Sequence, residues 1–152
     1  MSIVLKLRVQ QLDKQLARLP RPLPETPPPG WIATLRKALG MTLKTMGTRL
    51  GMTAEGAKRM ELREADGSLS LQLLSKAAEA LDMRLVYALV PKDGSLEKLI
   101  ERRALAMATD IVMRTHQTMK LEGQAVSDER LNEAIAEKAE ELRREMPKQL
   151  WD

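Results

Sequence analysis

The chain has 152 residues and a mass of 17.1 kDa, with 43% apolar and 30% charged residues, which suits one compact core or one small domain with an appendage. It contains no cysteine and one histidine, so disulfides, cysteine nucleophiles, histidine-based zinc sites and an ordinary Ser-His triad are excluded. We therefore expect a protein that is not an enzyme and that uses no metal and no cofactor. Only 2% of the residues are aromatic, a composition that favours helices built on aliphatic side chains and methionine.

Positive charge is concentrated in the first part of the chain. Residues 1–90 hold 14 basic and 8 acidic side chains, a balance of +6, whereas residues 91–152 hold 11 and 13, a balance of −2. The net charge of +4 permits a polyanionic partner. No apolar run approaches the roughly 18 residues of a membrane span, and charges interrupt residues 1–19, unlike a signal peptide. We expect a cytoplasmic protein.

The first predicted element is a helix over residues 3–19, followed by a spacer. Leu5, Val9, Leu12 and Leu16 recur at helical spacing, so residues 1–19 either dock on their own domain or act as an assembly arm that pairs with a second subunit. Six of the eight prolines fall in residues 20–29, which predicts an extended linker that can reach about 30 Å. A ligand for an SH3-type domain is the alternative interpretation of this proline spacing.

Residues 30–91 predict four helices and a strand. The first helix, residues 31–39, has Ile32 and Leu35 on one face and Arg36 on the opposite face. Three side chains are expected to be N-caps of the next helices, over residues 43–50, 54–63 and about 71–81: Thr42, Thr53 and Ser70. The β-branched and aromatic residues 84–90 predict a strand, paired either with the same strand of a second subunit or with a short stretch near Ser68 and Leu69.

Residues 92–152 predict a helical tail. Ser95 is the expected N-cap of a long helix that ends near Gly123, and Ser127 that of a last helix closed by Pro147. His116 is interpreted as an ordinary polar surface residue of the long helix. Charges of alternating sign on the last helix indicate a solvated face rather than a catalytic site.

The segment 43–62 has the pattern of a helix-turn-helix unit. Its apolar positions predict a shared buried face, formed by Met46, Leu50, Met52, Ala57 and Met60. Gly47 is the small residue expected where the two helices cross, and Gly51 is expected to make the sharp turn. A generic helical hairpin is the alternative.

In a helix-turn-helix unit the second helix enters the major groove of DNA by its N-terminal end. The residues then expected to face the bases are Thr53, Ala54, Glu55, Gly56, Lys58 and Arg59. The residues expected to contact phosphates are Thr42, Lys44, Thr45, Arg36 and Arg63. For each single charge, a purely solvated role is the alternative.

Six short stretches within residues 30–91 form a recognisable pattern: GWI at 30–32, ALGMT at 38–42, RLG at 49–51, EAD at 64–66, AAEAL at 77–81 and LVYALVP at 85–91. With these stretches, residues 30–91 resemble a lambda-repressor-like, Xre-type helix-turn-helix domain, and more narrowly the family called mobile mystery protein A. Leu43 and Ala57 depart from the usual pattern of such domains. The resemblance implies DNA binding and regulation, in a mobile-element gene pair whose second product, mobile mystery protein B, resembles Fic-domain adenylyl transferases.

That implied neighbour gives the tail a second interpretation. Residues 118–123 (TMKLEG) resemble the inhibitory motif of antitoxins that silence Fic enzymes, with Thr118, Glu122 and Gly123 at the motif positions. Glu122 would pair with an arginine that otherwise binds the ATP γ-phosphate. The alternative is an ordinary helix C-terminus with Gly123 just past the last turn.

Together these patterns predict a mainly α-helical, homodimeric DNA-binding regulator that recognises an inverted-repeat operator, with flanking helices that serve assembly or a protein partner. The expected divisions are residues 1–19, 20–29, 30–91 and 92–152. The alternative function is an antitoxin that inhibits a Fic-type partner through Glu122. Replacement of Glu122 is expected to separate the two functions.

Overall fold

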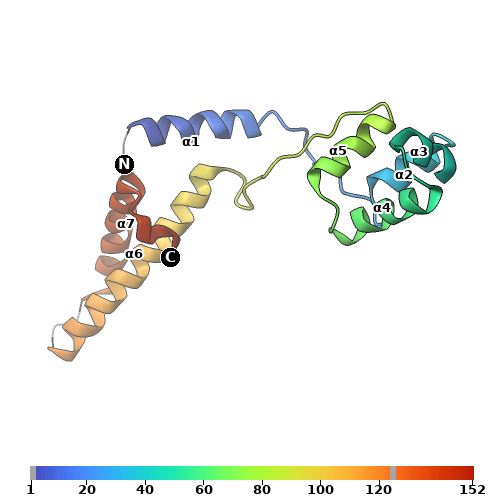
Figure 1. The fold of residues 1–152 in the computed structure, drawn as a ribbon. Coiled ribbons are helices and arrows are strands. Elements are labelled where there is room, and N and C mark those ends of the chain that lie inside the picture. Colours follow the sequence, from blue (N-terminus) through green and yellow to red (C-terminus); the bar gives the residue numbers. More distant parts are fainter. Residues whose placement is uncertain (1–2, 124–125) are drawn as a thin grey trace. The chain divides into compact units, whose positions relative to one another are not determined.

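The computed structural model describes residues 3–123 and 126–152, and its regular elements in that part of the chain are helices. They are α1 (Ile3–Leu16), α2 (Trp31–Ala38), α3 (Leu43–Leu50), α4 (Ala54–Asp66), α5 (Leu71–Ala80), α6 (Leu96–Leu121) and α7 (Asp128–Glu145), followed by the 3-10 helix η1 (Lys148–Trp151) (Figure 1). The expected mainly α-helical class is confirmed. Within the described ranges, each helix is too short or too polar to cross a membrane.

The chain forms two compact units. One unit, residues 21–88, contains α2 to α5, and the other, Met1–Pro20 with Leu89–Asp152, contains α1, α6, α7 and η1. The proline-rich residues 20–29 lie outside the helices, as expected of a spacer. The N-terminal helix thus belongs with the C-terminal helices, although the sequence separates α1 from α6 by a whole unit.

Hydroxyl side chains begin five of the helices at the predicted positions. Each accepts a hydrogen bond from the backbone N–H three residues further on, and they are Thr42, Thr53, Ser70, Ser95 and Ser127. An N-cap of this kind contributes about 1 kcal/mol. Two of the predicted helix ends are glycines in the left-handed conformation, Gly51 with φ 71° and Gly123 with φ 79°.

The predicted strand over residues 84–90 is wrong for the described chain, which forms no strand there. The short stretch near Ser68 and Leu69 does not pair with it either. The backbone N–H groups of Ser68 and Leu69 both donate to the carbonyl oxygen of Arg63 and close the end of α4. A strand is stable only when its N–H and C=O groups find a partner strand. Residues 84–90 have no partner strand among the residues that the structure describes, so β propensity alone does not form the element.

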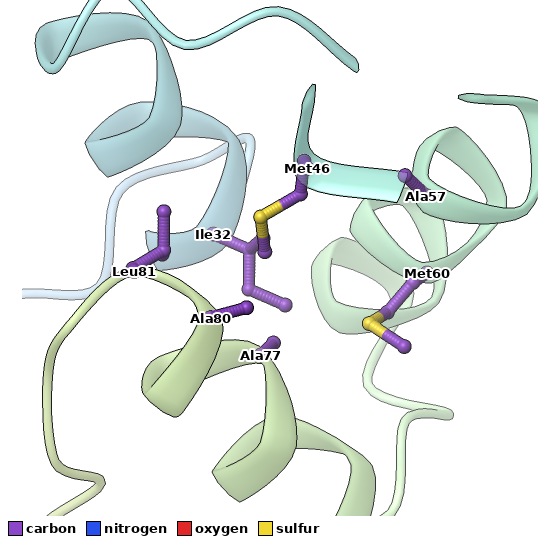
Figure 2. Close-up of a cluster of buried hydrophobic side chains, with 7 residues drawn as sticks. All are labelled: Ile32, Met46, Ala57, Met60, Ala77, Ala80 and Leu81. Carbon is purple, nitrogen blue, oxygen red and sulfur yellow. The ribbon is translucent and has the colours of Figure 1, made fainter. Parts of the chain in front are cut away.

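Apolar side chains from all four helices fill the core of the α2–α5 unit. Its buried members are Ile32, Met46, Ala57, Met60, Ala77, Ala80 and Leu81. Figure 2 shows the Met46 side chain pointing toward Ile32, with Ala57 and Met60 on the neighbouring α4. The inward positions predicted for Met46, Ala57 and Met60 are confirmed. On α5 the buried face is formed by Ala77 and Ala80, whereas Leu71 is 52% exposed.

Gly47 sets how closely α3 approaches the start of α4. A Cβ atom at this position would lie 2.7 Å from the carbonyl oxygen of Met52 and 2.8 Å from that of Thr53. Both obstacles are backbone atoms, which cannot swing aside as the end of a side chain can. The prediction that Gly47 is the small residue at the helix crossing is therefore confirmed.

In the other unit, α6 and α7 pack side by side over small residues. Ala104 and Ala108, one turn apart on α6, are buried with Leu142 of α7, and Leu150 of η1 closes the same cluster. The Asp13 carboxylate of α1 accepts hydrogen bonds from the backbone N–H groups of Leu96, at 2.7 Å, and Glu97, at 3.2 Å. An acidic side chain at the start of a helix satisfies free N–H groups and the helix dipole. This contact holds α1 against α6 in the same chain.

We predict that Gly47→Ala destabilises the α2–α5 unit by about 2 kcal/mol, because the added Cβ forces two backbone segments apart. Urea unfolding followed by circular dichroism measures the change. Gly56→Ala is the matched control, since the nearest neighbour of its Cβ is the flexible Met52 sulfur at 3.3 Å. A loss of stability at Gly56 as large as that at Gly47 would contradict the role of the backbone contact.

Candidate nucleic-acid interface

A short and well-bonded connection joins α3 to α4. Only residues 51–53 separate the two helices, and the backbone N–H of Met52 donates to the carbonyl oxygen of Gly47 at 2.8 Å. The hydroxyl of Thr53 then accepts from the backbone N–H of Gly56 at 3.0 Å, which begins α4. These bonds and the left-handed Gly51 fix the direction in which α4 leaves the turn.

The first two turns of α4 divide cleanly between core and surface. Five of the six residues predicted to face bases are exposed: Thr53, Ala54, Glu55, Lys58 and Arg59. Gly56, the sixth, is half-buried and lies against Met52. On the opposite face, Ala57 is 1% and Met60 is 6% exposed. The structure therefore brings the predicted base-contacting residues together on one solvent-facing surface, with Gly56 at its edge.

The cations of this surface differ in their availability. Within the described ranges, Lys44, Lys58 and Arg59 form no ion pair and no side-chain hydrogen bond. In contrast, Arg49 pairs with Asp82 at 3.0 Å. A cation without an internal partner keeps its charge available for an anion, so the three available cations at the start of α3 and along α4 form an electropositive surface.

Arg36 is not on this surface, and its prediction as a phosphate contact is wrong. The side chain is buried, its Nε and Nη2 donate to the two carboxylate oxygens of Glu61, and its Nη1 donates to the carbonyl oxygen of Met41 at 2.8 Å. The expectation that Arg36 lies opposite Ile32 is also wrong, because Arg36 follows Ile32 by one turn and both face the core from the same side of α2. That spacing was visible in the sequence, whereas the Glu61 partner on α4 was not.

The start of α3 presents the other predicted phosphate contacts. Thr42, Lys44 and Thr45 are all exposed. The Thr42 hydroxyl lies 2.9 Å from that of Thr45 and accepts from the Thr45 backbone N–H at 3.1 Å. A helix start combines free N–H groups with a favourable dipole for a negative group, and here Lys44 adds a full charge.

Arg63 closes the C-terminal end of α4. Its Nη2 donates to the carbonyl oxygen of Ser68 at 3.2 Å, although the side chain remains exposed. Hydrogen bonds from Ser68 also lower the pKa of the Asp66 carboxyl. The guanidinium that was predicted to contact phosphate is thus partly used to order the turn after α4.

Glu64 is a positioning residue that the sequence interpretation missed. Its carboxylate accepts hydrogen bonds from the backbone N–H groups of Trp31, at 2.9 Å, and Ile32, at 2.8 Å. Gly30 precedes α2 and offers no side chain to cap it, so Glu64 of α4 serves as the cap from a distant part of the chain. The signal in the sequence was a helix start without its own capping residue.

The predicted Fic-inhibitory segment has the geometry of a helix end. The hydroxyl of Thr118 donates to the carbonyl oxygen of Arg114 at 3.1 Å, Glu122 is the C-cap of α6, and Gly123 follows in the left-handed conformation. The segment therefore has the backbone conformation of an ordinary helix C-terminus, which was the alternative expectation. Glu122 is exposed, and an inhibitory role for it stays a prediction.

His116 is less exposed than predicted. It is half-buried in an apolar cleft of about 200 Å³ between α6 and α7, and its Nδ1 is buried without a hydrogen-bond partner in the described chain. Met119 and Leu131 line the same cleft, so apolar packing across the two helices covers the ring.

Comparisons with protein-family models, with curated proteins and with solved structures give no match for the chain. Among the described residues, no group of acidic and histidine side chains is arranged to hold a metal ion.

We predict that Glu61→Ala destabilises the α2–α5 unit by about 3–5 kcal/mol, because it leaves the Arg36 charge buried without its partner. Chemical unfolding measures the loss. The control Glu55→Ala removes an exposed carboxylate from the same helix and is expected to change stability by less than about 0.5 kcal/mol. Equal effects of the two substitutions would show that the buried pair does not attach α2 to α4.

Proposed function

We propose that the chain is a sequence-specific DNA-binding transcriptional regulator in which α3 and α4 form a lambda-repressor-like helix-turn-helix unit. The observation that carries the proposal is the division of α4, whose first turns expose polar and basic side chains while Ala57 and Met60 anchor the opposite face. A recognition helix needs this division, because one face must hold it on the domain while the other enters the major groove.

The exposed side chains of α4 have the chemistry needed to distinguish base pairs. Arg59 and Lys58 carry donors suited to guanine, and the Glu55 carboxylate accepts from the amino group of cytosine. Arg59 lies one turn after Glu55, yet the two form no ion pair within 4.0 Å in the described structure, so both remain available. Gly56 lies at the edge of this face against Met52, and its lack of a side chain allows α4 to approach the DNA closely.

Backbone contacts to the DNA come from the helix ends in this proposal. Thr42, Lys44 and Thr45 present hydroxyl, ammonium and backbone N–H groups at the start of α3, and Arg63 adds a guanidinium at the far end of α4. Such contacts fix the orientation of the protein on the duplex, whereas base contacts specify the sequence. In this proposal the buried Arg36 stabilises the unit and does not contact the DNA.

The proposed target is an inverted repeat bound by a homodimer in the cytoplasm. Two copies related by a two-fold axis would present their α4 helices to half-sites about 34 Å apart, which is one turn of DNA. We propose that this site lies upstream of the chain's own gene, as expected for an autorepressor or antitoxin-like member of a mobile-element gene pair.

The test is a fluorescence anisotropy titration of the full chain against its upstream duplex, beside a scrambled duplex of equal length, at two salt concentrations. Specific binding that weakens with salt is expected, since phosphate contacts release counterions. For Lys58→Ala/Arg59→Ala we expect at least about tenfold weaker binding to the upstream duplex, because each base contact contributes about 1–3 kcal/mol.

The matched control is Lys98→Ala/Lys120→Ala, which removes the same charge from exposed positions on α6. It is expected to bind the upstream duplex nearly as the unchanged chain does. If both double variants weaken binding equally, the effect comes from net charge and the role of α4 is refuted. Equal affinity of the unchanged chain for both duplexes would refute sequence recognition.

A further inference from the structure

Residues 84–90 (RLVYALV) have backbone groups that are free to pair. The preceding Met83 donates its N–H to Ala78, and the following Pro91 accepts from Gly94, but residues 84–90 themselves form no backbone hydrogen bond in the described chain. Apolar side chains are also exposed along the segment, with Val86 at 69% and Tyr87 at 66%. An unpaired edge of this kind is a template for another strand.

The side chains of this segment favour a strand as soon as a partner is present. Valine and tyrosine fit a pleated surface, and Pro91 gives the strand a natural end because it lacks an N–H donor. Leu85 and Val86 also line an apolar groove of about 250 Å³ in the α2–α5 unit, together with Trp31 and Leu35. The exposed segment therefore continues an apolar surface of that unit.

The segment is complementary to itself when it runs antiparallel. With the two-fold axis at Tyr87, Leu85 lies opposite Leu89 of the second copy, and Val86 lies opposite Ala88, so apolar residues meet in every inner pair. Arg84 then lies opposite Val90, and the two Arg84 side chains are about 20 Å apart at roughly 3.4 Å per residue. A register centred on Arg84 would instead place two like charges together.

We propose that residues 84–90 of two copies pair as an antiparallel two-stranded ribbon centred on Tyr87, and that this ribbon is the dimer interface. The proposed partner is a second copy of the chain, because in this register each copy supplies the backbone groups and the apolar side chains that the other copy needs. The inference deepens the proposed function, which needs two copies on an inverted repeat. Self-association is measurable without DNA, so a failure of the proposed dimer interface is distinguishable from a failure of the proposed DNA binding.

Single cysteines test the register in the full chain, which contains no other thiol. Tyr87→Cys places two cysteines directly opposite each other, with Cα atoms about 4.5–5.5 Å apart, which is within the range of a disulfide. We expect oxidation to give a covalent dimer at least roughly tenfold faster than for the control Leu85→Cys, because a preformed dimer raises the effective concentration of the thiols. In the control the two cysteines lie about 13 Å apart along the ribbon.

A proline variant makes the test independent of disulfide chemistry. Val86→Pro removes a backbone donor at an exposed position outside the helices, so circular dichroism is expected to stay unchanged while light scattering shows a monomer. Val86→Thr, which keeps the strand preference, is expected to remain dimeric. Equal crosslinking at positions 85 and 87, a monomeric unchanged chain, or a dimer that survives Val86→Pro would overturn the proposal.

Discussion

The close approach at Gly47 is the constraint on which the arrangement of α3 and α4 depends. Two backbone carbonyl groups occupy the space that a Cβ would need, so any larger residue must move the start of α4. Because residues 51–53 are fully used in the connection, α4 cannot adjust without disturbing its own N-cap. The position of Gly47 thus determines which side of α4 faces the core and which side faces solvent.

Polar contacts from the second half of α4 complete this division. Glu61 binds the buried Arg36, and Glu64 caps α2 through the backbone of Trp31 and Ile32. Both carboxylates are directed into the α2–α5 unit, whereas Lys58 and Arg59 in the first half of α4 are exposed. The second half of α4 therefore binds α2, and its first half presents the proposed DNA-binding surface.

The sequence predicted what depends on local chemistry and missed what depends on distant partners. Hydroxyl caps such as Thr42, and the turn at Gly51, follow from short-range rules and are confirmed. The burial of Arg36 required Glu61, which lies 25 residues away, and the strand at 84–90 required a partner strand that residues 3–123 and 126–152 do not provide. The exposed face of α4 was predictable from spacing, whereas binding of DNA by that face remains a proposal.

The most direct measurement of the central claim is the change in backbone amide resonances of the ¹⁵N-labelled chain when its upstream duplex is added. We expect the largest shifts at residues 42–45 and 53–59, with little change along α6 and α7, and smaller, more uniform shifts with a scrambled duplex. Shifts confined to α6 and α7 would contradict binding through α4, and the same shifts with both duplexes would contradict sequence-specific recognition.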